Sequence, residues 1–342
     1  SVWLTTLIWT FWRVQSAICR KASAWLALLL ASLVLFVTLY SIPNVYQSLY
    51  WRSGVFTYVV PLIGLGAYIG FLTHAITRWH TGPRAIVFLV LSFSIAFFAG
   101  GFTETYVVLQ TGILFLALWF SLLVLPPHHK RRAMLLLLAG FTGSILALAV
   151  VALAPGIHIR QASLATTAPA LWPLLKNSAL YTHWFLRDQF QHLWPRILLA
   201  AVVPALAIWQ IADHTSPMPY FERRALIWLL VLLPAAAYLL LFFCYIPAFY
   251  ALLYLPPDRV LVIQQFVFTG FLVSWSGLTG WTLKRHIHLN IGETRKAVLN
   301  AGLTAMITLL ALIPVTAARE LLPQRRLANA FAAMWDTQHQ AI

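Results

Sequence analysis

The first acidic residue of the chain, Glu104, stands between two long apolar runs. A carboxylate close to hydrocarbon is costly unless it is paired or hydrated, so an ionisable residue in such a place marks a candidate functional site. Glu104 could orient or deprotonate a hydroxyl group as a general base. The competing interpretation is a side chain in headgroup water at the end of a helical hairpin, and both interpretations stay open.

Aromatic and basic residues that could bind a sugar or a phosphate occur in segment 46–54. Trp51 offers a stacking surface, and Arg52 offers a guanidinium next to it. An aromatic belt with one snorkelling arginine would explain the same composition.

Two proline-containing turns carry the other candidate binding residues. Arg160 follows the turn at 154–156 and could hold phosphate oxygens or pair with Glu104. Asp258 and Arg259 follow Pro256 and Pro257, where acid and base could also simply cap one another.

No motif for a metal or a redox cofactor is found. The eleven histidines include no two at facing mid-membrane positions, which argues against bis-histidine haem. Cys19 and Cys244 form no motif, and the chain has no Walker loop. We therefore predict no cofactor and no metal site.

Composition identifies the class of protein. Of the 342 residues, 61% are hydrophobic and 9% are charged, whereas soluble domains have roughly 25% charged residues. The net charge of +15 could suit nucleic acid, but the basic residues lie in short clusters between apolar runs, as in membrane proteins. We expect membrane lipids and no nucleic acid as partners.

The apolar runs predict an all-α, polytopic membrane helix bundle with about nine transmembrane helices, within a range of eight to eleven. Residues 1–22 would form an interfacial or partial helix, 23–317 the bundle, and 318–342 the start of an extracytoplasmic tail, with truncation at both termini. Loop 155–195 should carry short amphipathic helices lying on the bilayer. Glycines 64, 66, 140 and 143 are expected to allow close helix packing. The nine predicted spans are 23–42, 55–77, 85–99, 105–125, 133–154, 197–211, 225–246, 260–283 and 297–317.

The basic residues orient these spans. Fourteen of the 23 Lys and Arg residues fall on the side that holds residues 78–84 and 130–132, and nine fall on the other side. Because basic residues in short loops stay on the cytoplasmic face, Glu104, Arg52, loop 155–195, Asp258 and Arg259 are predicted to be extracytoplasmic.

Several short motifs, taken in order from about Ser48 to Asp336, carry a family resemblance. The chain resembles a family of uncharacterised bacterial polytopic membrane proteins, which is itself similar in layout to the GT-C glycosyltransferases. The resemblance implies a multi-pass protein of a bacterial cell membrane that transfers a sugar from a polyprenyl-phosphate donor on the extracytoplasmic face. The motifs are 49–54 with Tyr58, 101–105, 154–156 with Arg160, 256–259, and Trp335 with Asp336.

The chain also departs from the GT-C pattern. Those enzymes carry a catalytic Asp in the first extracytoplasmic loop, whereas this chain has no Asp before Asp188. In the enzyme hypothesis, Glu104 takes the place of that base, Arg160 and Arg259 hold phosphate oxygens, and Trp51 stacks on a sugar. The alternative hypothesis is a non-catalytic, cofactor-free accessory subunit of a larger integral-membrane complex, such as a respiratory or photosynthetic one.

Overall fold

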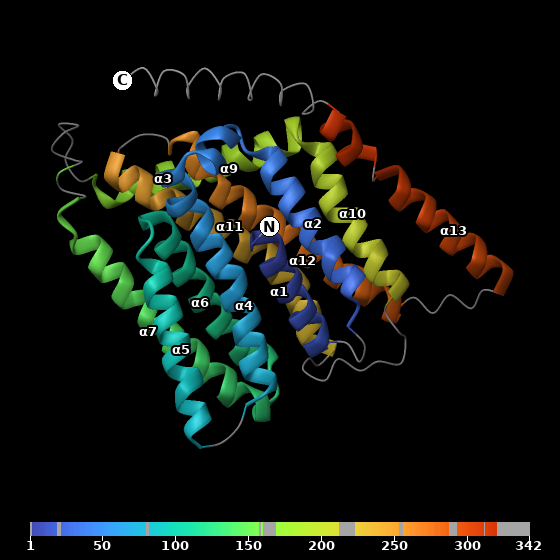
Figure 1. Cartoon of the computed structure of the whole chain (residues 1–342), viewed down its shortest axis with the longest axis horizontal. Helices are drawn as coiled ribbons and strands as arrows, with labels where there is room; N and C mark the ends of the chain where they lie inside the picture. The colour runs from blue at the N-terminus through green and yellow to red at the C-terminus, as the bar shows by residue number, and fades with distance from the viewer. Residues whose placement is uncertain are drawn as a thin grey trace, which may run out of the picture. The chain divides into compact units, whose positions relative to one another are not determined.

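The computed structural model describes residues 2–18, 22–79, 82–156, 159, 169–211, 223–252, 256–286, 293–310 and 312–319 (Figure 1). The chain divides into two compact units, 1–288 and 289–342. Every regular element in the described residues is helical, which confirms the all-α prediction. The first unit contains α1 (Val2–Ile18), α2 (Ala24–Ser41), η1 (Tyr46–Tyr50), α3 (Arg52–Gly54), η2 (Val55–Val59), α4 (Val60–Thr77), α5 (Pro83–Gly100), α6 (Glu104–Val124), α7 (Pro127–Leu153), α9 (Leu171–His192), α10 (Trp194–Ile211), α11 (Arg223–Leu252), η3 (Asp258–Val260) and α12 (Leu261–His286); the second contains α13 (Glu293–Leu310).

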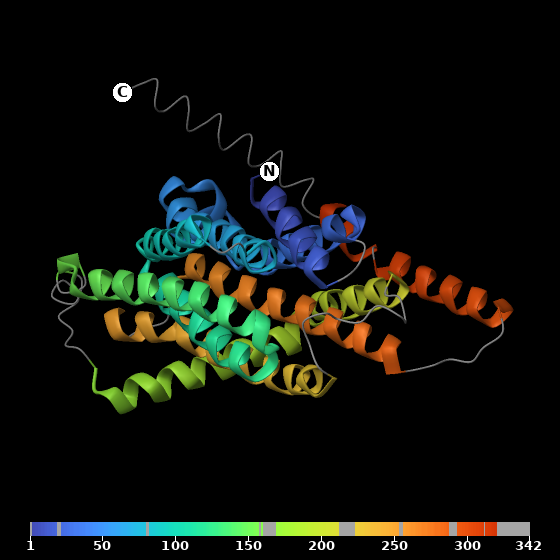
Figure 2. The same cartoon turned by 90° about the horizontal axis from the view of Figure 1, so that it is seen from below.

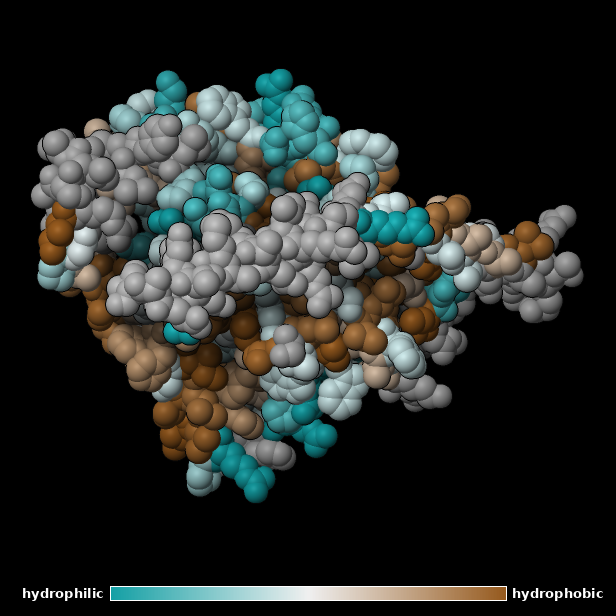
Figure 3. All heavy atoms as spheres, turned by 45° about the horizontal axis from the view of Figure 1, so that its top comes forward, coloured by the Kyte–Doolittle hydropathy of each residue, from teal (hydrophilic) through white to brown (hydrophobic). Residues whose placement is uncertain are grey.

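Nine helices in the described part of the chain are long and apolar enough to cross a membrane, as the apolar runs predict. They are α2, residues 52–77 ending in α4, α5, α6, α7, α10, α11, α12, and residues 301–319 of the second unit. Hydrophobic side chains are exposed over much of the face in Figure 3, with groups of hydrophilic residues above and below. The protein is a polytopic membrane helix bundle.

Successive spans alternate in direction, so the connections of the first unit gather at two ends. The end where α2 finishes and α6 begins is called the upper end, because α3 and α9 lie at the top of Figure 1. The connection between α4 and α5, at residues 78–82, lies at the opposite, lower end (Figure 1). Glu104, Trp51 and Arg259 all belong to the upper end.

Glycines let the helices approach closely. Lipid tails are as apolar as leucine, so membrane helices associate through close packing and hydrogen bonds rather than through a hydrophobic force. A Cβ at Gly66 of α4 would touch side chains of α1, and one at Gly143 of α7 would meet the backbone of Phe93 in α5. A Cβ at Gly140 would strike the hydroxyl of Tyr68. These contacts confirm the predicted packing role of three glycines, while Gly64 has only the Cβ of Ala99, at 3.9 Å.

A buried polar network joins α5, α6 and α7. The amide nitrogen of Gln110 donates to the carbonyl oxygen of Ala96 at 2.7 Å and to the hydroxyl of Ser144 at 3.0 Å. The hydroxyls of Thr111 and Ser144 lie 2.8 Å apart. Polar groups inside a membrane bundle need such partners, so this network fixes how the three helices meet.

Within the described residues of region 155–195, α9 is a helix of 22 residues, longer than the short amphipathic helices that the sequence predicts there. Its buried residues recur every three or four positions, which places them on one face. That face packs against α11, and Tyr181 and Phe185 contact Phe249 and Phe268. The helix lies across the top of the first unit in Figure 1, and Figure 2, seen from below, shows its length running across the view. Its opposite face exposes Trp172 and Trp184, as expected for an amphipathic interfacial helix. The buried residues are Leu174, Ser178, Thr182, Phe185 and Gln189.

Candidate functional site

The segment between α2 and α4 forms a compact turn that positions Trp51. The backbone N–H of Gln47 donates to Asn44 Oδ1 at 3.0 Å, and the hydroxyl of Ser48 donates to the Asn44 carbonyl at 3.0 Å. A Cβ at Gly54 would collide with the carbonyl oxygen of Gln47, so only glycine fits there. Two π-helical segments, η1 and η2, flank Trp51, whose own backbone is extended. Short π-helical segments are frequent at functional sites.

Arg259 meets Trp51 across this turn. The guanidinium carbon of Arg259 lies 5.1 Å from the centre of the Trp51 ring, within cation–π range. The Ser48 hydroxyl is 3.4 Å from the carbonyl oxygen of Arg259, which ties the turn to the start of α12. Trp51 keeps 47% of its surface exposed. The two residues therefore form an aromatic and cationic surface at the upper end of the bundle.

One side-chain nitrogen of Arg259, Nε, is buried. Its side chain is half-buried, and Nε has no hydrogen-bond partner among the residues that the structure describes. A buried donor of this kind needs an explanation, and an anionic oxygen is the natural partner of a guanidinium. Arg52 and Asp258, the neighbours of Trp51 and Arg259 in sequence, are exposed.

Glu104 is the first residue of α6 and is half-buried. A carboxylate at a helix N-terminus is stabilised by the helix dipole. Helix α6 packs against α11, with Gly112 of α6 lying against Phe243. From this contact, α6 leads back to Glu104, and α11 leads on to its end at Leu252, shortly before Arg259. Glu104 thus shares the upper end with Arg259, although it belongs to the group formed by α5, α6 and α7.

Arg160 lies outside the described residues, so its predicted role stays a prediction. Among the other candidates, the structure brings Trp51 and Arg259 together and leaves Arg52 and Asp258 exposed beside them. Asp258 opens η3, where the N–H of Val260 donates to the carbonyl of Pro257 at 2.8 Å.

Three buried polar residues of α12 are absent from the predicted site. Gln264, Gln265 and Thr269 expose at most 3% of their surface, and each has at least one polar side-chain atom without a partner within the described ranges. They follow Arg259 within about three helical turns. The sequence feature that could have revealed them is the pair of glutamines, 264 and 265, inside an apolar run. This run belongs to the predicted span 260–283, in which the two glutamines have no further predicted role.

Within the described part of the chain, no three His, Cys, Asp or Glu side chains gather in a way that could hold a metal ion. The pair of Arg259 and Trp51 offers one guanidinium beside one indole, with the carboxylate of Asp258 adjacent in sequence. Such a set recognises an anionic group attached to an apolar or sugar-like surface.

Comparison with protein-family models, with curated proteins and with solved structures finds no match to this chain. The function is therefore inferred from the residues and their geometry alone.

Proposed function

We propose that this chain is a multi-pass protein of a bacterial cell membrane that binds a polyprenyl-phosphate sugar at its extracytoplasmic face and transfers the sugar to an acceptor, as GT-C glycosyltransferases do. The observation that carries the proposal is the pair formed by Arg259 and Trp51. It combines a phosphate-binding group with a sugar-stacking surface at one end of a membrane bundle.

The two residues of the pair bind different parts of the donor. The Arg259 guanidinium binds the phosphate, since Nε has no partner among the described residues and guanidinium groups bind phosphate through charge-assisted hydrogen bonds. The exposed part of the Trp51 ring stacks on the sugar. Arg52 adds positive charge near the phosphate, and Asp258 accepts hydrogen bonds from sugar hydroxyls; Arg160, outside the described residues, keeps its predicted role of holding phosphate oxygens.

Glu104 acts on the acceptor. Its carboxylate takes the proton of the acceptor hydroxyl while the acceptor oxygen bonds to the anomeric carbon of the sugar. The bond from that carbon to the phosphate oxygen breaks, and polyprenyl phosphate leaves. The Arg259 guanidinium stabilises the negative charge of the departing phosphate.

The distribution of basic residues supports the orientation. The lower end carries Arg78, Arg84 and residues 130–132, as expected of a cytoplasmic face. The upper end, with the pair and with Glu104, then faces outwards, where lipid-linked sugars serve as donors for GT-C enzymes.

A second function is favoured by the scarcity of acids. The chain has eight Asp and Glu residues and no Asp before Asp188, so the aspartate that GT-C enzymes use is missing from the matching loop. The alternative is a cofactor-free accessory subunit that packs against other subunits of an integral-membrane complex.

Native mass spectrometry of the protein, extracted with a mild detergent from its own membrane, separates the two functions. We expect a lone chain that carries a polyprenyl phosphate, with retention of the lipid reduced at least tenfold in Arg259→Ala. The matched control is Arg187→Ala, because Arg187 is an exposed arginine of α9 at the same end. Equal retention by wild type and Arg259→Ala would remove the pair from the site, and stoichiometric co-purification of other subunits without this lipid would establish the alternative.

A further inference from the structure

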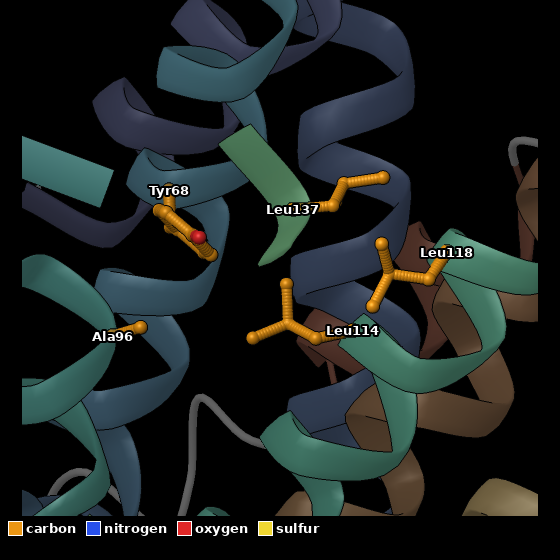
Figure 4. Close-up of a cluster of buried hydrophobic side chains, with 5 residues drawn as sticks. All are labelled: Tyr68, Ala96, Leu114, Leu118 and Leu137. Atoms are coloured by element: carbon orange, nitrogen blue, oxygen red, sulfur yellow. The ribbon is translucent and has the colours of Figure 1, made fainter. Parts of the chain in front are cut away.

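A groove runs down the lower half of the bundle between α4, α6 and α7. It has a volume of about 340 Å³ and an almost entirely apolar lining that includes Leu72, Ile76, Leu114, Ala117 and Leu137. Pockets of about 300–1,000 Å³ are typical ligand sites. The groove is bounded on one side by the buried cluster of Figure 4, in which Tyr68 and Ala96 lie opposite Leu114, Leu118 and Leu137.

The length of the groove matches one leaflet of a bilayer. Its lining on α4 extends from Leu65 to Ile76, which corresponds to about 16 Å of helix at 1.5 Å per residue. Half of a hydrocarbon core of roughly 30 Å is about 15 Å. Gln110, whose side chain belongs to the buried polar network, lies at the deep end. A chain entering from the lower end would therefore reach the bilayer midplane and stop there.

Basic residues surround the lower end of this groove. Arg78 directly follows α4 and is exposed. Arg131, also exposed, lies two residues before Ala133, which lines the groove. The ammonium group of Lys130 donates to the carbonyl of Leu122 at 2.7 Å and so joins the start of α7 to the end of α6. The connection at 78–82 contains a basic residue and no acidic one, and the chain has no acidic residue before Glu104.

We propose that this groove binds one acyl chain of an anionic phospholipid from the leaflet at the lower end, with Arg78 and Arg131 holding the phosphate. Apolar volume, leaflet-matched depth and positive charge at the entrance together select a charged lipid over a neutral one. Basic clusters beside transmembrane helices attract anionic headgroups in this way. The site lies at the end opposite Trp51 and Arg259, so it does not depend on the proposed transfer function.

The test is binding of phosphatidylglycerol and phosphatidylcholine to the delipidated full chain in neutral detergent, measured by native mass spectrometry. We expect tighter binding of phosphatidylglycerol. Because each basic residue near a membrane surface contributes about a fivefold gain in affinity, Arg78→Ala combined with Arg131→Ala should weaken phosphatidylglycerol binding roughly 25-fold. Arg187→Ala, at the opposite end, should change nothing.

A second variant tests the groove itself. Ala117→Phe places a ring in the apolar lining and should abolish the binding of both lipids, whereas Ala149→Phe, at an exposed position of α7, should not. If Ala117→Phe does not fold, the double variant Arg78→Ala and Arg131→Ala still tests the proposal. Both arginines are exposed, so their loss leaves the packing intact. Equal affinity for the two lipids, or an unchanged affinity in the arginine double variant, would overturn the proposal.

Discussion

The guanidinium of Arg259 lies 5.1 Å from the centre of the Trp51 ring, although the two residues are separated by most of the chain. A cation–π contact of this kind contributes about 0.5–1 kcal/mol at an exposed site. It also joins the turn after α2 to the start of α12, an attachment that the hydrogen bond from Ser48 reinforces. The contact thus helps to fix how this turn meets the start of α12 at the upper end of the bundle.

Arg259→Lys should retain the fold and lose the lipid. Lysine keeps the charge but lacks the planar fork of donors that binds two phosphate oxygens. We expect polyprenyl-phosphate retention in native mass spectra to fall at least tenfold, with an unfolding temperature close to that of the wild type. Trp51→Phe, which keeps an aromatic face, should retain more lipid than Trp51→Ala. Full retention by Arg259→Lys would mean that charge alone suffices.

Glu104→Gln should abolish sugar transfer without loss of folded protein. The amide keeps the size of the side chain at the start of α6 but cannot accept the acceptor's proton. Transfer is measured in vesicles from a polyprenyl-phosphate sugar to an acceptor, and the amount of folded protein by size-exclusion chromatography in detergent. Asp188→Asn is the control, because Asp188 is an exposed carboxylate of α9, 3.8 Å from His192. Unchanged transfer in Glu104→Gln removes Glu104 from the site, and no transfer even by the wild type is the result that the subunit function predicts.

Gly280→Ala should destabilise the bundle where Gly270→Ala does not. A Cβ at Gly280 would collide with the backbone of Ala205 in α10, which has no flexible side chain to move aside, whereas Gly270 has nothing within 4 Å of such a Cβ. Overpacking of this kind costs about 1–3 kcal/mol, while Ala in place of Gly in an open helix position is favourable by about 1 kcal/mol. Thermal unfolding in detergent, followed by circular dichroism, should show opposite shifts. Similar shifts in the two variants would contradict the close contact between α10 and α12.

The apolar runs predict the spans well because hydropathy and length are local properties of the chain. They identify α4, α6 and α12 without any knowledge of neighbours. The pairing of Arg259 with Trp51 depends instead on how η3 packs against the turn before α4, which no local pattern encodes. Helix α9 is a similar case: the composition of the region predicts amphipathic structure, but the length of the helix depends on packing against α11. Hydropathy averaged over the whole run does not reveal the buried Gln264, because the apolar residues around it dominate the average.

Gln110→Leu should loosen the contact between α5, α6 and α7. The substitution removes hydrogen bonds to the Ala96 carbonyl and to Ser144, and leaves both acceptors buried. An unsatisfied buried polar group costs about 1–3 kcal/mol, whereas side-chain hydrogen bonds between membrane helices average about 0.6 kcal/mol. We therefore expect a loss of roughly 1–2 kcal/mol in the free energy of unfolding, between these limits. Gln210→Leu, at an exposed position near the end of α10, is the matched control and should be nearly neutral. Gln110 also lies at the deep end of the lipid groove. If Gln110→Leu raised the affinity for phosphatidylglycerol and left the stability unchanged, the amide would restrict the length of the groove and would not hold the helices together.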